Sequence, residues 1–359
     1  MCQARGVDAT EARHREVVTA AWNDYGDARS IVEIHELSAM VSTNRVYRLA
    51  LDDGSHVITK SSNYGSFFLF AEDHERLHRA NQLLHGGPFD GFMANVLTRD
   101  GRPYLWYDGE MWAVFYEEVA VKDRLPRVLT DAQVERLGNE IGRFHRACDG
   151  IARLIPAPSK TAKSDAVNLY NMLGSRSAGE HFGLDQSRVD LVRRHTHRFL
   201  MAIHESGYDY WPKIPVLIDW NLGNFSVELI DDDPDRFVLF SRWDYDWFRI
   251  ESRLLDFYFL SRVSSSTGDR SVWTYGSHTL LEPRFVRFLR AYHAVFPLSE
   301  EEIRFLKEAY RFFLLNYVIR EGRHFFRYEF WQHLLHDAVD VQLPALDDVD
   351  LRPLLSILR

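Results

Sequence analysis

Hydrophobic and polar residues alternate in short runs along the first third of the chain, and this pattern predicts β-strands. Turn residues interrupt the alternation at Asp52-Asp53-Gly54 and at Asp108-Gly109, so each marks a hairpin between two strands. The predicted strands are residues 31–36, 44–51, 55–60, 104–107 and 111–116. One helix is inserted among them at 67–84, where apolar residues recur at three- and four-residue steps.

The pattern becomes helical after Thr130, which together with Asp131 forms a typical helix start. Further helices are predicted at 187–206 and from Leu254 onward, with short strands at 216–218 and 237–243. The chain therefore predicts an α+β protein of two lobes. Residues 1–119 form a β-rich N-terminal lobe, and residues 120–359 form a mainly helical C-terminal lobe.

Composition excludes several classes of protein. The 359 residues are 46% hydrophobic and 14% aromatic, which is enough for buried cores in both lobes. A formal charge of -9 gives no reason to expect binding to nucleic acid or to a membrane surface. Cys2 and Cys148 are too few for a disulfide framework, and neither a secretory signal nor a membrane-spanning run is present. We expect a cytoplasmic monomer or homodimer.

The candidate chemistry is concentrated in residues 215–227, P-V-L-I-D-W-N-L-G-N-F-S-V. A short strand ends at Asp219, Asn224 follows five residues later just before a second apolar strand, and Asp244 ends a further apolar strand downstream. Each of these residues alone is an ordinary turn residue. Together they supply a carboxylate that can accept a proton from a hydroxyl, and two oxygen ligands suited to Mg²⁺. The set predicts phosphoryl transfer from a nucleoside triphosphate to an alcohol.

The same segment resembles the catalytic loop of the aminoglycoside phosphotransferase, choline kinase and type II-like homoserine kinase superfamily, which has a protein-kinase-like fold. The family motif H-G-D-x-x-x-x-N falls on residues 217–224, and a second motif of two spaced Asp residues falls on Asp244 and Asp256. The resemblance implies that Asp219 is the catalytic base. It also implies that Asn224 and Asp244 hold Mg²⁺, and that Asp256 braces the catalytic loop through hydrogen bonds.

The loop at Ser42, Thr43 and Asn44 lies between two predicted strands, as does the family's loop that covers the phosphates. It lacks the glycines that let backbone amides approach a phosphate closely. The hydroxyl groups of Ser42 and Thr43 are candidates to replace those amides. The resemblance thus implies that these three residues bind the nucleotide.

Three further positions match the nucleotide-binding half of the family. Lys60 ends the strand after the first hairpin and resembles the lysine that holds the α- and β-phosphates of ATP or GTP. Residues 115–119 resemble the segment that links the two lobes. The resemblance implies that the backbone of this segment, at Glu117 and Val119, pairs with the base of the nucleotide.

Two positions depart from the family pattern. Leu217 and Ile218 replace the motif His and Gly, and the family's His is thought to orient the loop around the base. Its loss predicts slow turnover or a divergent branch. Arg242 stands in a strand that is usually apolar there, and it either faces solvent or contacts phosphate. Asp246 is a candidate for a second metal ligand or for a contact to the substrate.

The stretch H-E-R-L-H at 74–78 also fits the zinc-protease pattern H-E-x-x-H. On a helix, His74 and His78 share a face, but a catalytic zinc needs a third ligand and the flanking residues are charged. The kinase interpretation assigns Glu75, fifteen residues after Lys60, as the carboxylate that pairs with that lysine. Glu72 is the second candidate for this pair.

The sequence therefore predicts an ATP- or GTP- and Mg²⁺-dependent kinase of small molecules. We expect the acceptor to be an amine-bearing alcohol of the aminoglycoside, amino-sugar, homoserine or choline type, bound by the helical lobe. The alternative is a protein of the same fold that binds nucleotide without efficient turnover, because Leu217 replaces the motif His.

Overall fold

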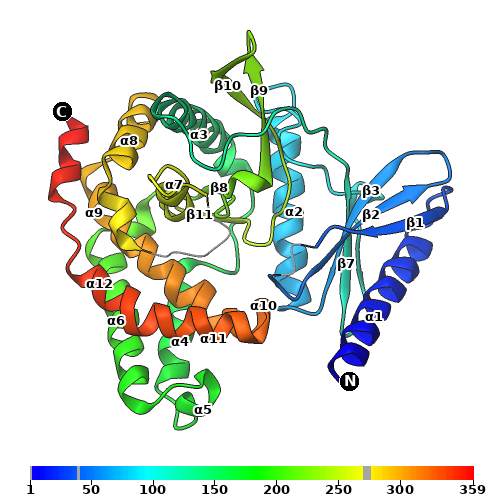
Figure 1. Ribbon diagram of the computed structural model, residues 1–359, viewed down its shortest axis with the longest axis horizontal. Coiled ribbons are helices and arrows are strands. Elements are labelled where there is room, and N and C mark those ends of the chain that lie inside the picture. The colour runs from blue at the N-terminus through cyan, green and yellow to red at the C-terminus, as the bar shows by residue number, and fades with distance from the viewer. Residues whose placement is uncertain (1, 39–40, 270–275) are drawn as a thin grey trace.

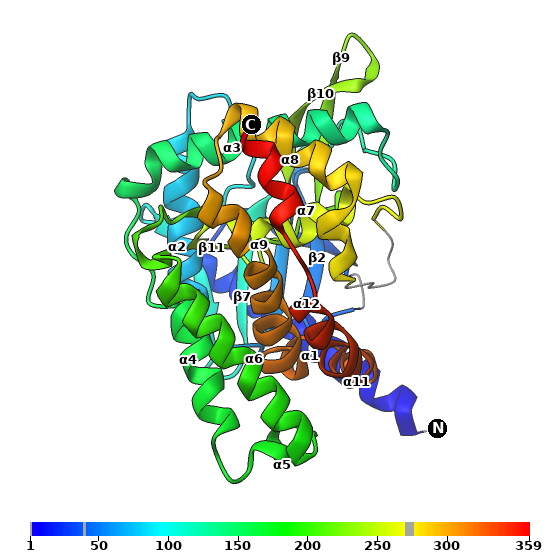
Figure 2. The same ribbon diagram turned by 90° about the vertical axis from the view of Figure 1, so that its left-hand side faces the viewer.

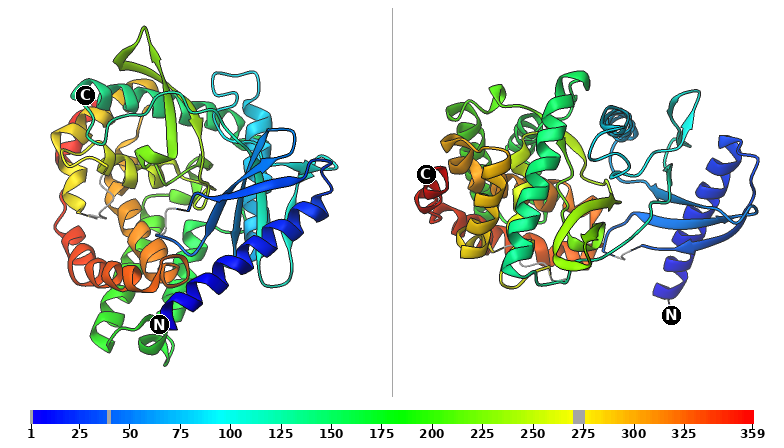
Figure 3. Two further views of the ribbon diagram at one scale, coloured as in Figure 1. Left: turned by 45° about the vertical axis from the view of Figure 1, so that its right-hand side comes forward. Right: turned by 90° about the horizontal axis from the view of Figure 1, so that it is seen from above.

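The computed structural model describes residues 2–38, 41–269 and 276–359, and its elements form two lobes (Figures 1 and 3). The N-terminal lobe contains an antiparallel sheet of five strands in the order β1-β2-β3-β7-β6. The strands are β1 (Ile31–Glu36), β2 (Arg45–Leu51), β3 (His56–Ser62), β6 (Leu105–Tyr107) and β7 (Trp112–Glu117). All five predicted strands are confirmed, and a small hairpin of β4 (Thr98–Arg99) and β5 (Arg102–Pro103) adds to them.

Each face of this sheet is covered by one helix (Figure 1). Alternation along β2 places Tyr47, Leu49 and Leu51 in a small core, to which α1 (Cys2–Tyr25) contributes Val18 and Trp22. The opposite face packs against α2 (Phe67–Leu84), whose buried residues share the main core with alternate residues of β7. The bounds of α2 are those predicted from its apolar spacing.

The C-terminal lobe is mainly helical, and its long helices lie beside one another in Figure 2. Its helices are α3 (Asp131–Ile151), α4 (Ala162–Leu173), α5 (Ala178–Phe182), α6 (Gln186–Glu205), α7 (Phe257–Val263), α8 (Pro283–Val295), α9 (Glu300–Phe313), α10 (Gly322–Phe325), α11 (Tyr328–Asp337) and α12 (Leu343–Asp347). Short 3-10 and π segments join several of them. No helix in the described part of the chain is both long and apolar enough to cross a membrane. The α+β, bilobal fold predicted from the sequence is confirmed.

Two strand pairs in this lobe bring distant loops together. β8 (Ile214–Val216) pairs with β11 (Arg249–Glu251), and β9 (Phe225–Ile230) pairs with β10 (Asp233–Arg242). The loop from β8 to β9 and the loop from β10 to β11 therefore lie at the same junction. The sequence predicted the strands that precede Asp219 and Asp244, with bounds shifted by a few residues, and an apolar strand after Asn224, which is β9; it did not predict β11.

Helix α3 approaches α8 closely because two of its residues are glycines. A Cβ atom added to Gly138 would lie 2.5 Å from the carbonyl oxygen of Phe288, and one added to Gly142 would lie 3.0 Å from Cβ of Val295. The capping box at Thr130 and Gln133 fixes where α3 begins. Close packing of these two helices therefore depends on the absence of side chains at two positions.

We expect Gly138→Ala to destabilise the protein by about 2 kcal/mol, because the new methyl group must push α3 away from α8. Gly150→Ala is the matched control on the same helix, since a Cβ at Gly150 meets no atom within 4 Å. Alanine is favoured over glycine in a helix, so the control should not lose stability. Urea unfolding followed by circular dichroism measures both, and equal midpoints for the two variants would contradict the packing argument.

Candidate active site

Asp219 lies in the loop after β8, and one buried carboxylate holds this loop. Asp256 accepts a hydrogen bond from the backbone N–H of Ile218 (2.6 Å) and another from Nε1 of Trp220 (2.7 Å). It also contacts Nε2 of His145 on α3 at 2.9 Å, and Nδ1 of His145 lies 2.9 Å from the hydroxyl of Tyr292 on α8. A carboxylate only accepts, so the Nε2–H of His145 donates to Asp256. Asp256 thus braces the loop on both sides of Asp219.

Ile218 adopts a left-handed backbone conformation, with φ of 59°. This region is unfavourable for a β-branched residue and costs about 1–3 kcal/mol. The hydrogen bond from its N–H to Asp256 and the burial of its side chain hold it there. The position is the one at which the family motif has Gly, so the loop keeps a glycine-like backbone shape without the glycine.

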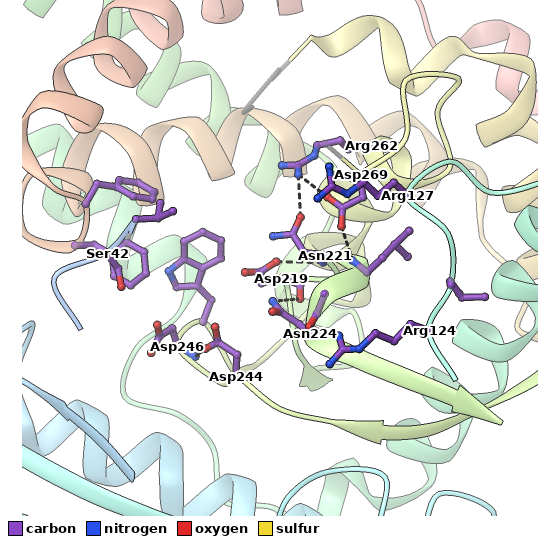
Figure 4. A pocket seen from close by; sticks show the side chains of 17 residues that line it. Ser42, Arg124, Arg127, Asp219, Asn221, Asn224, Asp244, Asp246, Arg262 and Asp269 are labelled. Atoms are coloured by element: carbon purple, nitrogen blue, oxygen red, sulfur yellow. Dashed lines mark hydrogen bonds and ion pairs between the residues drawn. The ribbon is translucent and has the colours of Figure 1, made fainter. Parts of the chain in front are cut away.

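The side chain of Asp219 points into a cavity of about 600 Å³ that also contains Asn221, Asn224 and Asp244 (Figure 4). The Asn221 N–H donates to Oδ1 of Asp219 (3.2 Å), and Nδ2 of Asn224 donates to the carbonyl oxygen of Asp219 (3.4 Å). Burial raises the pKa of Asp219 to about 6, and the neighbouring Asp244 acts in the same direction. Asp219 is therefore a stronger base than an exposed carboxylate, and it is still mostly ionised at neutral pH.

Lys60 reaches across from β3 to two acids of the β10–β11 loop. Its Nζ lies 3.0 Å from Oδ1 of Asp244, and it also forms an ion pair with Asp246. Asn44 donates to the other oxygen of Asp246 at 3.0 Å. Burial opposes the charged form of Lys60, but the two carboxylates outweigh it and raise the pKa of Lys60 above its usual value. The lysine therefore remains charged in the interior of the cleft.

The predicted ion pair between Glu75 and Lys60 is not formed. Glu75 is exposed, and Glu72, the second candidate, pairs with Arg76 (2.9 Å) and accepts from the N–H of Ser159. The helical period explains the error, because the face of α2 toward Lys60 carries His74 and Asp73 instead. His74 is buried and lies 2.5 Å from the hydroxyl of Tyr116, and the charge of Lys60 adds to the burial that lowers the pKa of His74 to about 4.

The histidines of H-E-R-L-H are used for packing in this structure. Nδ1 of His74 lies 2.8 Å from the carbonyl oxygen of Phe70, so the hydrogen bonds to Phe70 and Tyr116 occupy both ring nitrogens. His78 contacts Gln82 one turn further along α2. Within the described ranges, no group of three or more His, Cys, Asp or Glu side chains is arranged to hold a metal ion. The geometry gives no support to the zinc-protease interpretation.

A second cavity, of about 410 Å³, lies between the lobes and has mostly apolar walls on the side of the sheet. Leu37, Val46 and Ile58 form this wall, and both Glu117 and Val119 line the cavity where the chain passes from one lobe to the other. Lys60, Arg124, Gly223, Asn224 and Asp244 line its other end. The last four also line the cavity of Asp219, so the two cavities adjoin each other.

The loop at residues 42–44 is bonded to the C-terminal lobe; Ala39 and Met40 lie outside the described residues. Ser42 lines the cavity of Asp219 and forms a backbone bridge with Phe326. The Thr43 N–H donates to the carbonyl oxygen of Phe325 (2.7 Å), and its hydroxyl donates to that of His324 (3.0 Å). Of the three predicted residues, Ser42 thus faces the cavity, whereas Asn44 reaches it only through Asp246.

The sequence left open whether Arg242 faces solvent or contacts phosphate. In the structure it is buried, and it lines neither the cavity of Asp219 nor the cavity between the lobes. It is completely buried, stacks over the ring of Trp220 at 5.4 Å and donates to the carbonyl oxygen of Asp244 (3.2 Å). Its charge partly offsets the rise in the pKa of Asp219.

Sequence reasoning also missed Arg262, which donates to both Asn221 and Asp269 at the far side of the cavity (Figure 4).

The two lobes define a protein-kinase-like fold. The chain is similar to an amicoumacin kinase solved in complex with AMP-PNP, Ca²⁺ and Ami, with a TM-score of 0.62 and 12% identity over 96% of this chain and 97% of that one. It is also similar to a microcompartment-associated aminopropanol kinase, with a TM-score of 0.55 and 16% identity over 90% and 94%. No protein-family model matches the sequence, and comparison with curated proteins gives no significant match.

We expect Asp256→Asn to destabilise the fold by about 3 kcal/mol, because three buried donors would face an amide that can accept from fewer of them. Urea unfolding measures this loss. The control is Asp209→Asn at an exposed position, which should leave the midpoint nearly unchanged. If Asp256→Asn were as stable as the control, the network would not hold the loop.

Proposed function

We propose that the protein is an ATP- and Mg²⁺-dependent kinase of small molecules, which transfers the γ-phosphate to a hydroxyl group. One observation carries the proposal: Asp219, Asn224 and Asp244 line a single cavity, and that cavity adjoins a nucleotide-sized space between the lobes, with which it shares Asn224 and Asp244. The amicoumacin kinase of the same fold was solved with AMP-PNP and Ca²⁺, which supports a nucleotide and a divalent cation here. The boundary between the proposed lobes falls after Val119.

In this proposal the base of the nucleotide occupies the apolar end of the inter-lobe cavity, next to Glu117 and Val119. The triphosphate then extends toward Lys60 and Ser42. Lys60 is already charged and buried, so it loses little side-chain freedom when phosphate oxygens join its carboxylate partners. Arg124 lines both cavities and offers a second positive charge along this path.

The donor set fits a hard divalent cation. Asn224 and Asp244 supply an amide and a carboxylate oxygen at one edge of the cavity, and Mg²⁺ is usually bound by one or two protein groups plus phosphate oxygens. When bound, Mg²⁺ would neutralise the charge that develops on the phosphate oxygens. Asp246 is close enough to Lys60 to hold the lysine while Asp244 is engaged elsewhere.

Asp219 would orient the acceptor hydroxyl and accept its proton as the oxygen attacks the γ-phosphate. Its raised pKa, about 6, suits this task at neutral pH. The hydrogen bond from the Asn221 N–H fixes one carboxylate oxygen and leaves the other for the acceptor. We propose a small amine-bearing alcohol as acceptor, in line with the name of the aminopropanol kinase of the same fold.

The second candidate function is nucleotide binding without efficient turnover. It is favoured by Leu217 at the position of the motif His, because a buried leucine cannot donate a hydrogen bond to the loops around Asp219. Arg242, which donates to the carbonyl oxygen of Asp244, makes a contact of the kind that such a histidine would provide. This contact supports the kinase proposal, which the shared cavity of Asp219, Asn224 and Asp244 carries.

Asp219→Asn should lower kcat for phosphorylation of an amino-alcohol panel about 10²–10⁴-fold, because the amide cannot accept the hydroxyl proton. Affinity for AMP-PNP should change by less than about twofold, since Asp219 does not hold the nucleotide. Asp190→Asn, on an exposed face of α6, is the control. Wild-type protein that binds AMP-PNP tightly but phosphorylates no alcohol in the panel would favour the binding-protein alternative.

Asp244→Asn should weaken binding of AMP-PNP at least about tenfold in the presence of Mg²⁺ and much less in its absence, because the lost carboxylate acts through the cation. Isothermal titration calorimetry with and without Mg²⁺ separates the two effects. An equal loss under both conditions would show that Asp244 acts only by positioning Lys60, and the metal assignment would then fail.

A further inference from the structure

A third cavity, of about 330 Å³, lies beneath α2 and is here called the α2–α4 cavity. Asp73 of α2 lines one side. The other side is lined by Lys160, just before α4, and by Asp165 in the first turn of α4. Lys60 and Asp246 lie at one end of it. It therefore shares Lys60 with the nucleotide cavity and Asp246 with the cavity of Asp219, yet neither function proposed above uses its space.

Most charged groups in its wall are already paired with one another. Asp165 accepts from Arg249 and from Arg320, each at 2.8 Å. Arg320 also pairs with Glu321 at 2.7 Å, and Glu321 accepts a hydrogen bond from the hydroxyl of Tyr64 at 3.0 Å. These groups form a network in which each carboxylate already has a partner.

Asp73 and Lys160 are the exceptions. In the described part of the chain, neither side chain has a hydrogen bond or an ion pair, and each is partly buried in the wall of the cavity. Burial raises the pKa of Asp73 to about 6 and lowers the pKa of Lys160, and each group partly counteracts the shift of the other. The two opposite charges thus face one cavity without contacting each other. An unpaired charge in the wall of a cavity lowers the free energy of unfolding, because it has lost part of its hydration without gaining a partner.

The rest of the wall is rich in aromatic rings. Phe70 and Trp112 stack on each other at a centroid distance of 3.8 Å, and Tyr64 and Trp247 also line the cavity. A space of about 330 Å³ is at the lower end of the range for small-molecule sites. The cavity therefore combines one free carboxylate, one free ammonium group and an apolar surface.

We propose that the α2–α4 cavity binds a small zwitterion with an apolar body. Its ammonium group pairs with Asp73, its carboxylate pairs with Lys160, and its body lies against the aromatic wall. A simple cation would leave Lys160 unpaired, and a simple anion would leave Asp73 unpaired, so a ligand with both charges suits the site best. The zwitterion is either one end of the phosphate acceptor or a separate effector, since Asp246 and Trp247 border both this cavity and that of Asp219.

The test uses the full chain without nucleotide, so its result does not depend on the proposed kinase activity. The probes are the standard amino acids at millimolar concentration, each compared with the matching amine that lacks the carboxylate and the matching acid that lacks the amine. At least one apolar or aromatic amino acid should raise Tm by several degrees, whereas its two analogues should not. The proposal fails if no amino acid raises Tm, or if either analogue works equally well.

Asp73→Asn and Lys160→Gln should each weaken binding of that amino acid at least tenfold in calorimetry. Glu75→Gln is the matched control, because it removes a carboxylate from the exposed face of the same helix and should bind as the wild type does. Each test variant removes a charge that has no ion pair, so neither should unfold more readily than the wild type. Unchanged affinity in both variants would overturn the proposal.

A further measurement separates this role from one in which Asp73 serves Lys60. Affinity for AMP-PNP should stay within about twofold in both variants. A tenfold loss in Asp73→Asn alone would assign Asp73 to the nucleotide site and overturn the proposal. If the bound amino acid carries a hydroxyl and becomes phosphorylated, it is the acceptor. If it changes AMP-PNP affinity without being phosphorylated, it is an effector, and either result supports the site.

Discussion

The buried carboxylate of Asp256 is the constraint on which the catalytic loop depends. It accepts from three groups on two segments: the backbone of Ile218 and the indole of Trp220 in the loop, and the imidazole of His145 on α3. His145 in turn contacts Tyr292 on α8, and Gly138 and Gly142 let these two helices approach. The position of Asp219 is therefore set by helix packing deep in the C-terminal lobe, and the strained backbone of Ile218 is tolerated because this network holds it on one side.

The charge distribution around Lys60 shows how the same site is prepared for a ligand. One lysine contacts two carboxylates in a buried position, so the cluster carries an excess negative charge; Arg242 partly offsets it, and the Asn44 amide donates a hydrogen bond to Asp246. Such a cluster is poorly solvated and is stabilised by any added cation. In the proposed function, a nucleotide with its metal would bring both signs of charge, with carboxylate oxygens available to the metal and the ammonium group available to the phosphates.

Hydrophobic periodicity was enough to predict the five-stranded sheet, helix α2 and the division into two lobes, because those patterns depend on burial alone. It also placed Asp219, Asn224 and Asp244 on loops that the β8–β11 and β9–β10 pairs bring together. The prediction of Glu75 as the partner of Lys60 was wrong. Glu75 and His74 are adjacent in sequence but lie about 100° apart around the helix, and the spacing from Lys60 does not decide which of them faces it. Arg242 and Asp73 could not be assigned, since burial of a charged side chain depends on contacts far apart in sequence.

The bonds of Thr43 to the segment around Phe325 have a mechanical consequence. The lobes are joined by the chain near Val119 on one side of the cleft, and by backbone hydrogen bonds of Val41, Ser42 and Thr43 on the other. Because the lobes are connected at both ends of the cleft, they cannot separate by a hinge motion about one end alone. Entry of a molecule as large as a nucleotide therefore requires one of two motions. Either the hydrogen bonds between residues 41–43 and the segment around Phe325 break, or one lobe rotates over the other while both connections remain.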